Sequence, residues 1–113
     1  MEKDFHRFLV ERGLEFKKDF FREKIFDDLI SVKGYHLRYD FWFPLKKLLI
    51  ELDGEQHYKY KPGLHKNQTE FNNQVENDKL KDEYAKNNGL KLVRVKQVDF
   101  GKWLNDLKDK FIK

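Results

Sequence analysis

Residues 35–57 are the stretch that most constrains how this chain folds. Three aromatic residues fall at every second position, Tyr39, Phe41 and Phe43, and they alternate with His36, Arg38, Asp40 and Trp42. After residues 44–46, a second apolar run covers residues 48–52. Alternation with a period of two is typical of a half-buried strand, so this stretch predicts two antiparallel strands joined by a tight turn.

The position of that turn predicts which side chains meet. If the turn is centred between residues 45 and 46, Asp40 lies opposite Glu51 and Arg38 lies opposite Asp53, with all four side chains on one face. The other face is expected to belong to the core, and it pairs Phe43 with Leu48, Phe41 with Ile50 and Tyr39 with Leu52.

The opposed carboxylates of Asp40 and Glu51 predict a metal site. Directly opposite residues have Cβ atoms about 5 Å apart, and like charges at that distance destabilise a sheet. A divalent cation such as Mg²⁺ relieves the repulsion, because it binds one or two carboxylates and fills its other positions with water. The alternative is an exposed polar face on which Arg38 pairs with Asp53 and Asp40 is solvated.

Length and composition limit the remaining choices. A chain of 113 residues forms one domain, residues 1–113, and its 11 Phe, 5 Tyr and 2 Trp can build a core although 39% of the residues are charged. The absence of cysteine excludes disulfides, thiolate zinc sites and thiol nucleophiles, and it fits a reducing compartment. No apolar run approaches the ~20 residues of a membrane span, and the N-terminus lacks the apolar region of a signal peptide. We therefore expect a cytoplasmic protein with no membrane partner.

The rest of the chain predicts helices on both sides of a sheet. Residues 2–12 read as an amphipathic helix that buries Phe5, Phe8 and Leu9 and ends at Gly13. The later elements are expected in this order: an edge strand at residues 15–21, a helical turn or strand at 26–33, a loop at 55–69, a helix from residue 67 or 69 to 88, a strand at 90–95 and a helix capped by Asp99. The predicted fold class is α/β (α+β), with a mixed four-stranded sheet flanked by helices.

A basic, aromatic segment follows the predicted metal site. The net charge of +4 permits a polyanionic partner without requiring one. Residues 58–66 contain no aspartate or glutamate. Their aromatic and basic residues are Tyr58, Lys59, Tyr60, Lys61, His65 and Lys66. Lysines there would hold phosphates while tyrosines stack on bases. A solvated loop that is basic without a partner is the alternative.

This order of elements and acids resembles that of the PD-(D/E)XK nuclease superfamily. The resemblance depends on Asp40, on residues 51–57 reading ELDGEQH, on a later helix that carries Asp78, and on a strand reading LVRV. More narrowly, the chain looks like the branch of very-short-patch-repair endonucleases and EDxHD-type phage homing endonuclease catalytic domains. The resemblance covers nearly the whole chain from Glu2 to the last helix, and it implies a restriction-endonuclease-like core.

The resemblance also implies roles for individual residues. Asp40, Glu51 and Asp53 would be the metal ligands or their immediate neighbours, and His57 would accept a proton from water because its unperturbed pKa is near 6.5. Asp53 stands where the superfamily usually has a lysine, so the usual candidate for orienting water is missing.

Weaker matches concern two helix acids and the segment after the second strand. Asp78 would orient His57 or support the metal, although it could equally form an ordinary helix-surface pair with Lys81, and Asp82 competes for its role. Glu2 best matches the first-helix glutamate, with Glu11 and Glu15 as competitors. The residues expected to contact nucleic acid are Gln56, Tyr58, Lys59, Tyr60, Lys61 and Lys66.

The resulting functional prediction is a Mg²⁺-dependent endonuclease that acts on DNA, with Mn²⁺ as a second suitable ion. A homodimer would allow two paired nicks. Three alternatives stay open: a structure-selective nuclease such as a Holliday-junction resolvase, a non-catalytic nucleic-acid-binding module on the same scaffold, and an interaction domain whose acidic face binds a basic protein.

Overall fold

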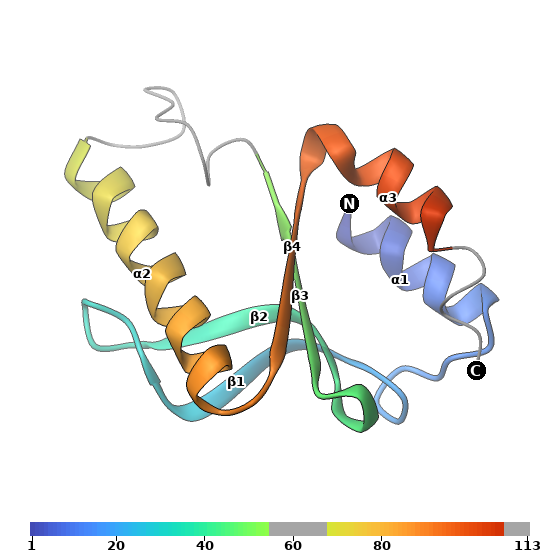
Figure 1. Ribbon diagram of the computed structural model, residues 1–113, viewed down its shortest axis with the longest axis horizontal. Coiled ribbons are helices and arrows are strands. Elements are labelled where there is room, and N and C mark those ends of the chain that lie inside the picture. Colours follow the sequence, from blue (N-terminus) through green and yellow to red (C-terminus); the bar gives the residue numbers. More distant parts are fainter. Residues whose placement is uncertain (55–67, 108–113) are drawn as a thin grey trace.

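A computed structural model describes residues 1–54 and 68–107 of the chain (Figure 1). The predicted basic segment and His57 therefore lie outside the described residues. The same is true of Gln56, Tyr58, Lys59, Tyr60, Lys61 and Lys66.

Four strands form one mixed sheet in the order β1-β2-β3-β4. The strands are β1 (Phe21–Ile30), β2 (His36–Phe43), β3 (Leu48–Asp53) and β4 (Lys91–Lys96). β1 pairs antiparallel with β2 and β2 pairs antiparallel with β3, whereas β3 and β4 are parallel. Because helices flank this sheet, the predicted α+β class with a mixed four-stranded sheet is confirmed.

The connection between β2 and β3 has the predicted register. A short 3₁₀ helix, η1 (Pro44–Lys46), makes the turn, and Lys47 completes it in the left-handed region at φ 48°. Phe43 then pairs with Leu48 and Phe41 with Ile50, as the alternation of the sequence predicts.

The ladder between β2 and β3 stops after Phe41 and Ile50, so it does not include three of the predicted pairings, which are Asp40 with Glu51, Tyr39 with Leu52 and Arg38 with Asp53. Tyr39 packs in a cluster with Leu49 on the α2 side, while Leu52 belongs to the cluster on the α1 side. Arg38 is exposed and pairs across to Ile25 of β1, so it does not face Asp53. In Figure 1, β1 and β2 run at a steep angle to β3 and β4.

The helices cover opposite faces of β3 and β4 (Figure 1). α1 (Glu2–Glu11) and α3 (Phe100–Asp106) lie on one side, and α2 (Gln68–Asn87) lies on the other. The first core cluster joins α1 to the sheet through Phe5, Leu9, Phe41 and Ile50, and Trp103 of α3 packs against it. The second joins α2 to the sheet through Leu37, Tyr39, Leu49 and Ala85. Each face of the sheet therefore has its own core.

The predicted edge strand at residues 15–21 is wrong. A turn occupies most of that segment: the N–H of Glu15 donates to the carboxylate of Asp19 at 2.7 Å, and Lys17 has φ 69°. The edge strand is β1, which begins at Phe21. Residues 26–33, for which a helical turn and a strand were both possible, form a strand as far as Ile30.

Helix ends agree with the sequence more closely. Gly13 has φ 90° directly after α1, and Gly89 has φ 68° after α2, the left-handed conformation that glycine tolerates at a helix C-terminus. Asp99 stands at the N-cap position of α3, but its side chain makes no capping hydrogen bond. In residues 1–54 and 68–107, no helix has both the length and the apolar character that crossing a bilayer requires.

Candidate functional site

A pocket of about 330 Å³ opens where β2 and β3 separate. The residues that line it come from α1, β2, β3 and α2, and they are Met1, Glu2, Asp40, Glu51, Leu52, Gly54 and Lys81. Three of the sequence-predicted acids, Glu2, Asp40 and Glu51, therefore share one pocket. Asp40 and Glu51 lie just beyond the last pair of the ladder between β2 and β3, and Glu2 comes from the first turn of α1.

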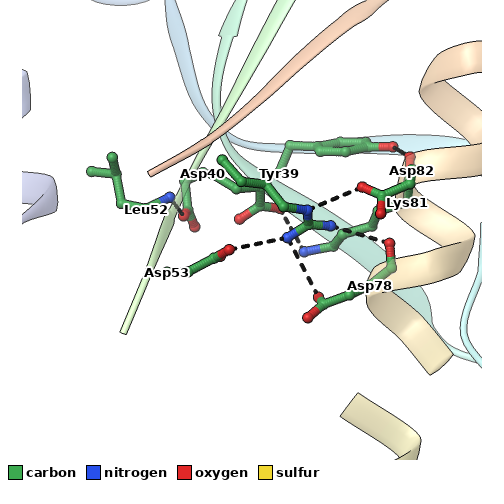
Figure 2. A network of polar contacts seen from close by, with 9 residues as sticks. Tyr39, Asp40, Leu52, Asp53, Asp78, Lys81 and Asp82 are labelled. Carbon is green, nitrogen blue, oxygen red and sulfur yellow. Dashed lines mark hydrogen bonds and ion pairs between the residues drawn. The ribbon is translucent and has the colours of Figure 1, made fainter. Parts of the chain in front are cut away.

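Asp40 connects the two strands at this point. Its Oδ2 accepts a hydrogen bond from the N–H of Leu52 at 2.8 Å (Figure 2). Burial first, and then the charge of Glu51 and a hydrogen bond with it, together raise the pKa of Asp40 to about 7, although the hydrogen bond from the Leu52 N–H lowers the pKa. The carboxyl groups of residues 40 and 51 therefore lie close together, although the ladder ends before it pairs the two residues.

Glu51 is held by a lysine from the facing helix. The Nζ of Lys81 lies 2.6 Å from Oε1 of Glu51, and the two residues are only 9% and 2% exposed. The hydroxyl of Tyr39 donates to the backbone carbonyl of Lys81 at 2.8 Å, and the Lys81 ammonium lies 5.6 Å from the Tyr39 ring centre. The alternative in which Lys81 forms a surface pair with Asp78 is wrong, because Lys81 points into the protein.

Glu2 approaches the pocket from the first turn of α1. Burial is the main cause that raises its pKa, followed by the charge of Asp40 and a hydrogen bond with it. Arg22 of β1 acts in the opposite direction and lowers the pKa. Three carboxyl groups therefore influence one another electrostatically within the pocket.

The other two predicted acids, Asp53 and Asp78, which Figure 2 labels, both contact Arg94. The Nη1 of Arg94 lies 3.4 Å from Asp53 and 3.7 Å from Asp78, and its Nε donates to Asp82 at 3.0 Å. Nη2 also donates to the backbone carbonyl of Asp78 at 3.1 Å. These residues line a neighbouring pocket of about 340 Å³, so Asp53 and Asp78 do not share the pocket of Asp40 and Glu51.

The donor set of the first pocket fits a hard divalent cation. Asp40 and Glu51 supply carboxylate oxygens that repel each other, and a cation between them would remove that repulsion. Within the described part of the chain, no group of three or more histidine, aspartate or glutamate residues has the geometry to hold a metal ion. Mg²⁺ does not require such a cage, because it keeps several waters and binds through one or two carboxylates.

Two residues of this region escape prediction from the sequence, Lys81 as the partner of Glu51 and Arg94 as the centre of an aspartate cluster. A weak signal exists for each. Lys81 precedes the buried Ala85 by four residues, which places both on the same stripe of α2. Arg94 stands between Val93 and Val95, so alternation turns it to the opposite face of the strand, where α2 packs.

One relative is found among known proteins. Over 62 residues, the chain is 39% identical to the uncharacterized protein 307L of Invertebrate iridescent virus 6. The match covers 55% of this chain and 32% of the viral protein, so the chain spans about a third of the length of the relative that it matches. No protein-family model and no solved structure matches the chain.

Proposed function

We propose that the protein is a Mg²⁺-dependent endonuclease that hydrolyses phosphodiester bonds in DNA. The observation that carries the proposal is the convergence of Asp40, Glu51 and Lys81 in one pocket at the point where β2 and β3 separate. Hydrolysis of a phosphodiester requires an activated water and neutralisation of charge on the phosphate. Two carboxylates and an ammonium group in contact are side chains suited to that task.

Each residue has a role in this proposal. Asp40 and Glu51 would hold the ion, which when bound lowers the pKa of water and neutralises charge on the phosphate. The ammonium of Lys81 would orient the attacking water or contact a phosphate oxygen, in place of the lysine that is absent at position 53. Glu2 would support the pocket from α1. His57 keeps its proposed part as proton acceptor, with Gln56 beside it, on the basis of the resemblance alone.

Asp53 and Asp78 have indirect roles in the same proposal. Both hold Arg94, which ties β4 to α2 next to Lys81. We assign them to the positioning of Lys81 and no longer to contact with the metal or the water.

A second candidate is a nucleic-acid-binding module that needs no metal. The observation in its favour is the 2.6 Å contact between Lys81 and Glu51, because the ammonium already compensates the charge that a metal would otherwise neutralise. Metal dependence separates the two functions.

Cleavage assays with matched variants test the proposal. Supercoiled, linear and branched DNA are incubated with and without Mg²⁺ or Mn²⁺, and products are resolved on gels. We expect metal-dependent cleavage by the wild type, a loss of at least about a hundredfold in Asp40→Asn and Glu51→Gln, and wild-type activity in Glu83→Gln, which changes an exposed acid of α2. Asn at position 40 keeps an acceptor for the N–H of Leu52, so a loss there reports chemistry more than folding.

The outcomes discriminate among the alternatives. Strong preference for branched over linear DNA would identify a structure-selective nuclease. Metal-independent binding of DNA without any cleavage would support the module, and absence of both binding and cleavage would overturn both candidates. The proposal also includes a cytoplasmic location and a homodimer able to nick both strands, which cell fractionation and analytical ultracentrifugation would test.

A further inference from the structure

Arg22 of β1 lies beside the candidate pocket. It pairs in register with Phe41, the residue that follows Asp40 on β2. Its positive charge also lowers the pKa of Glu2, which lines the pocket. A cation from the edge strand is therefore close to the acids of the site.

The guanidinium group of Arg22 is held by two partners that carry no negative charge. Its Nη1 lies 3.3 Å from Nδ1 of His6 on α1, and its central carbon lies 5.4 Å from the ring centre of Phe41. Because arginine only donates, Nδ1 of His6 is the acceptor in this contact. Within residues 1–54 and 68–107, Arg22 forms no ion pair with a carboxylate.

Two other arginines, Arg7 and Arg94, differ in this respect. Arg7, also near the N-terminus, is exposed and pairs with Asp4 at 2.9 Å, and Arg94 contacts three aspartates. Arg22 is instead half-buried and, among the described residues, forms no ion pair with a carboxylate. A planar guanidinium fixed in advance in this way is suited to bind a phosphate through two parallel hydrogen bonds.

We propose that Arg22 binds a backbone phosphate of the DNA strand, next to the phosphate that enters the pocket of Asp40 and Glu51. This inference rests on the proposed function and extends it by naming a second point of contact. Phe41 supports the guanidinium from below, and His6 is a positioning residue that fixes its direction. The strand would then pass from the metal pocket across the rim formed by α1 and β1.

Binding measurements without catalysis test the inference. Fluorescently labelled duplex DNA is titrated with protein in EDTA at several salt concentrations between about 50 and 200 mM, the range over which phosphate contacts lose affinity. We expect Arg22→Met to weaken binding about tenfold, corresponding to about 1.4 kcal/mol, and to reduce the slope of log K against log salt by about 0.9. Arg7→Met, which removes an exposed and already paired arginine, is the matched control and should retain wild-type binding.

A second variant separates binding from folding. Arg22→Lys keeps the charge but loses the planar fork, so we expect affinity between those of Arg22→Met and the wild type, with the salt slope unchanged. Circular dichroism checks that each variant is folded, and if Arg22→Met does not fold, Arg22→Lys decides: weaker binding supports the inference and wild-type binding overturns it. In cleavage assays, Arg22→Met should raise KM more than it lowers kcat, a pattern that a merely structural role would not produce.

The two proposals can fail separately. If Arg22→Met binds DNA as tightly as Arg7→Met with the same salt slope, the phosphate contact is wrong, while metal-dependent cleavage by the wild type would leave the nuclease proposal standing. If the wild type neither binds nor cleaves DNA, both are wrong.

Discussion

At the scale of single residues, the pair formed by Lys81 and Glu51 is the most consequential contact in the protein. Both side chains are almost fully removed from solvent, and each makes burial of the other tolerable. An ion pair of this kind contributes little net stability relative to apolar residues, but removal of one partner leaves a buried charge without compensation. The pair therefore makes the folded state dependent on both residues.

Lys81→Met should accordingly destabilise the metal-free protein. We expect a loss of about 3 kcal/mol in the free energy of unfolding, because the carboxylate of Glu51 stays buried without its ammonium. The double variant Lys81→Met with Glu51→Gln should recover at least half of that loss. Urea denaturation in EDTA measures both, and equal stability of the single variant and the wild type would contradict the coupling.

The sequence predicts one half of this site and misses the other for a physical reason. Asp40 and Glu51 are eleven residues apart and linked by a tight turn, so alternation alone aligns them. Lys81 reaches Glu51 across thirty residues of chain. No local pattern reports which face of a long, polar helix packs on which strand, and only the tertiary fold brings Lys81 to the pocket.

At the scale of elements, several polar contacts fasten α2 to the sheet, the ion pair of Lys81 and Glu51 among them. Arg94 of β4 contacts three aspartates, two of which, Asp78 and Asp82, belong to α2, and Tyr39 of β2 donates to the backbone of Lys81. Few apolar side chains of α2 are fully buried, Ala85 among them. The position of the helix, and with it that of Lys81, depends strongly on these polar contacts.

Arg94→Met should loosen α2 more than Asp82→Asn does. The guanidinium is only 23% exposed and serves several partners, so its loss should cost about 2–3 kcal/mol, whereas the Asp82 side chain is 56% exposed and its loss should cost less than about 1 kcal/mol. Hydrogen exchange of the α2 amides, measured alongside urea denaturation, should show faster opening in Arg94→Met. Similar effects of the two substitutions would show that Asp82 alone accounts for the contact.

The strands were predictable to different degrees. β2 and β3 follow from alternation and a tight turn, and β4 follows from its short apolar run. β1 does not, because Glu23 has φ 52° within the strand and the register with β2 shifts between Ile25 and Ile30. Its strand conformation depends on hydrogen bonds to β2, which a pattern in its own sequence does not record.

At the scale of the whole molecule, one sheet separates two apolar cores, and β3 contributes to both. Leu49 packs on the α2 side, while Ile50 and Leu52 pack on the side of α1 and α3. Loss of either core exposes the same buried strand. The protein should therefore unfold as a single cooperative unit.

Two tryptophans report on the two cores and test this expectation. Trp42 packs against Phe26 in the cluster on the α2 side. The ring centre of Trp103 lies 5.1 Å from that of Phe5 in the cluster on the α1 side. The variant Trp103→Phe leaves Trp42 as the fluorescent reporter, and Trp42→Phe leaves Trp103. In each variant, fluorescence and far-UV circular dichroism should give the same urea midpoint. A midpoint in fluorescence that differs from the one in circular dichroism would reveal that the layers unfold independently.

The hydrogen bond from the Leu52 amide to the Asp40 carboxylate gives Asp40 a structural role besides its proposed role as a metal ligand. Where β2 and β3 separate, the Asp40 side chain accepts the hydrogen bond that a backbone carbonyl accepts elsewhere in the ladder. Replacement of Asp40 by a residue that accepts no hydrogen bond would therefore leave the Leu52 amide without its acceptor, and it would also remove a charge. A relative without the proposed nuclease activity would be free to change Glu51 together with Lys81, but would still need aspartate or asparagine at position 40 to accept the hydrogen bond.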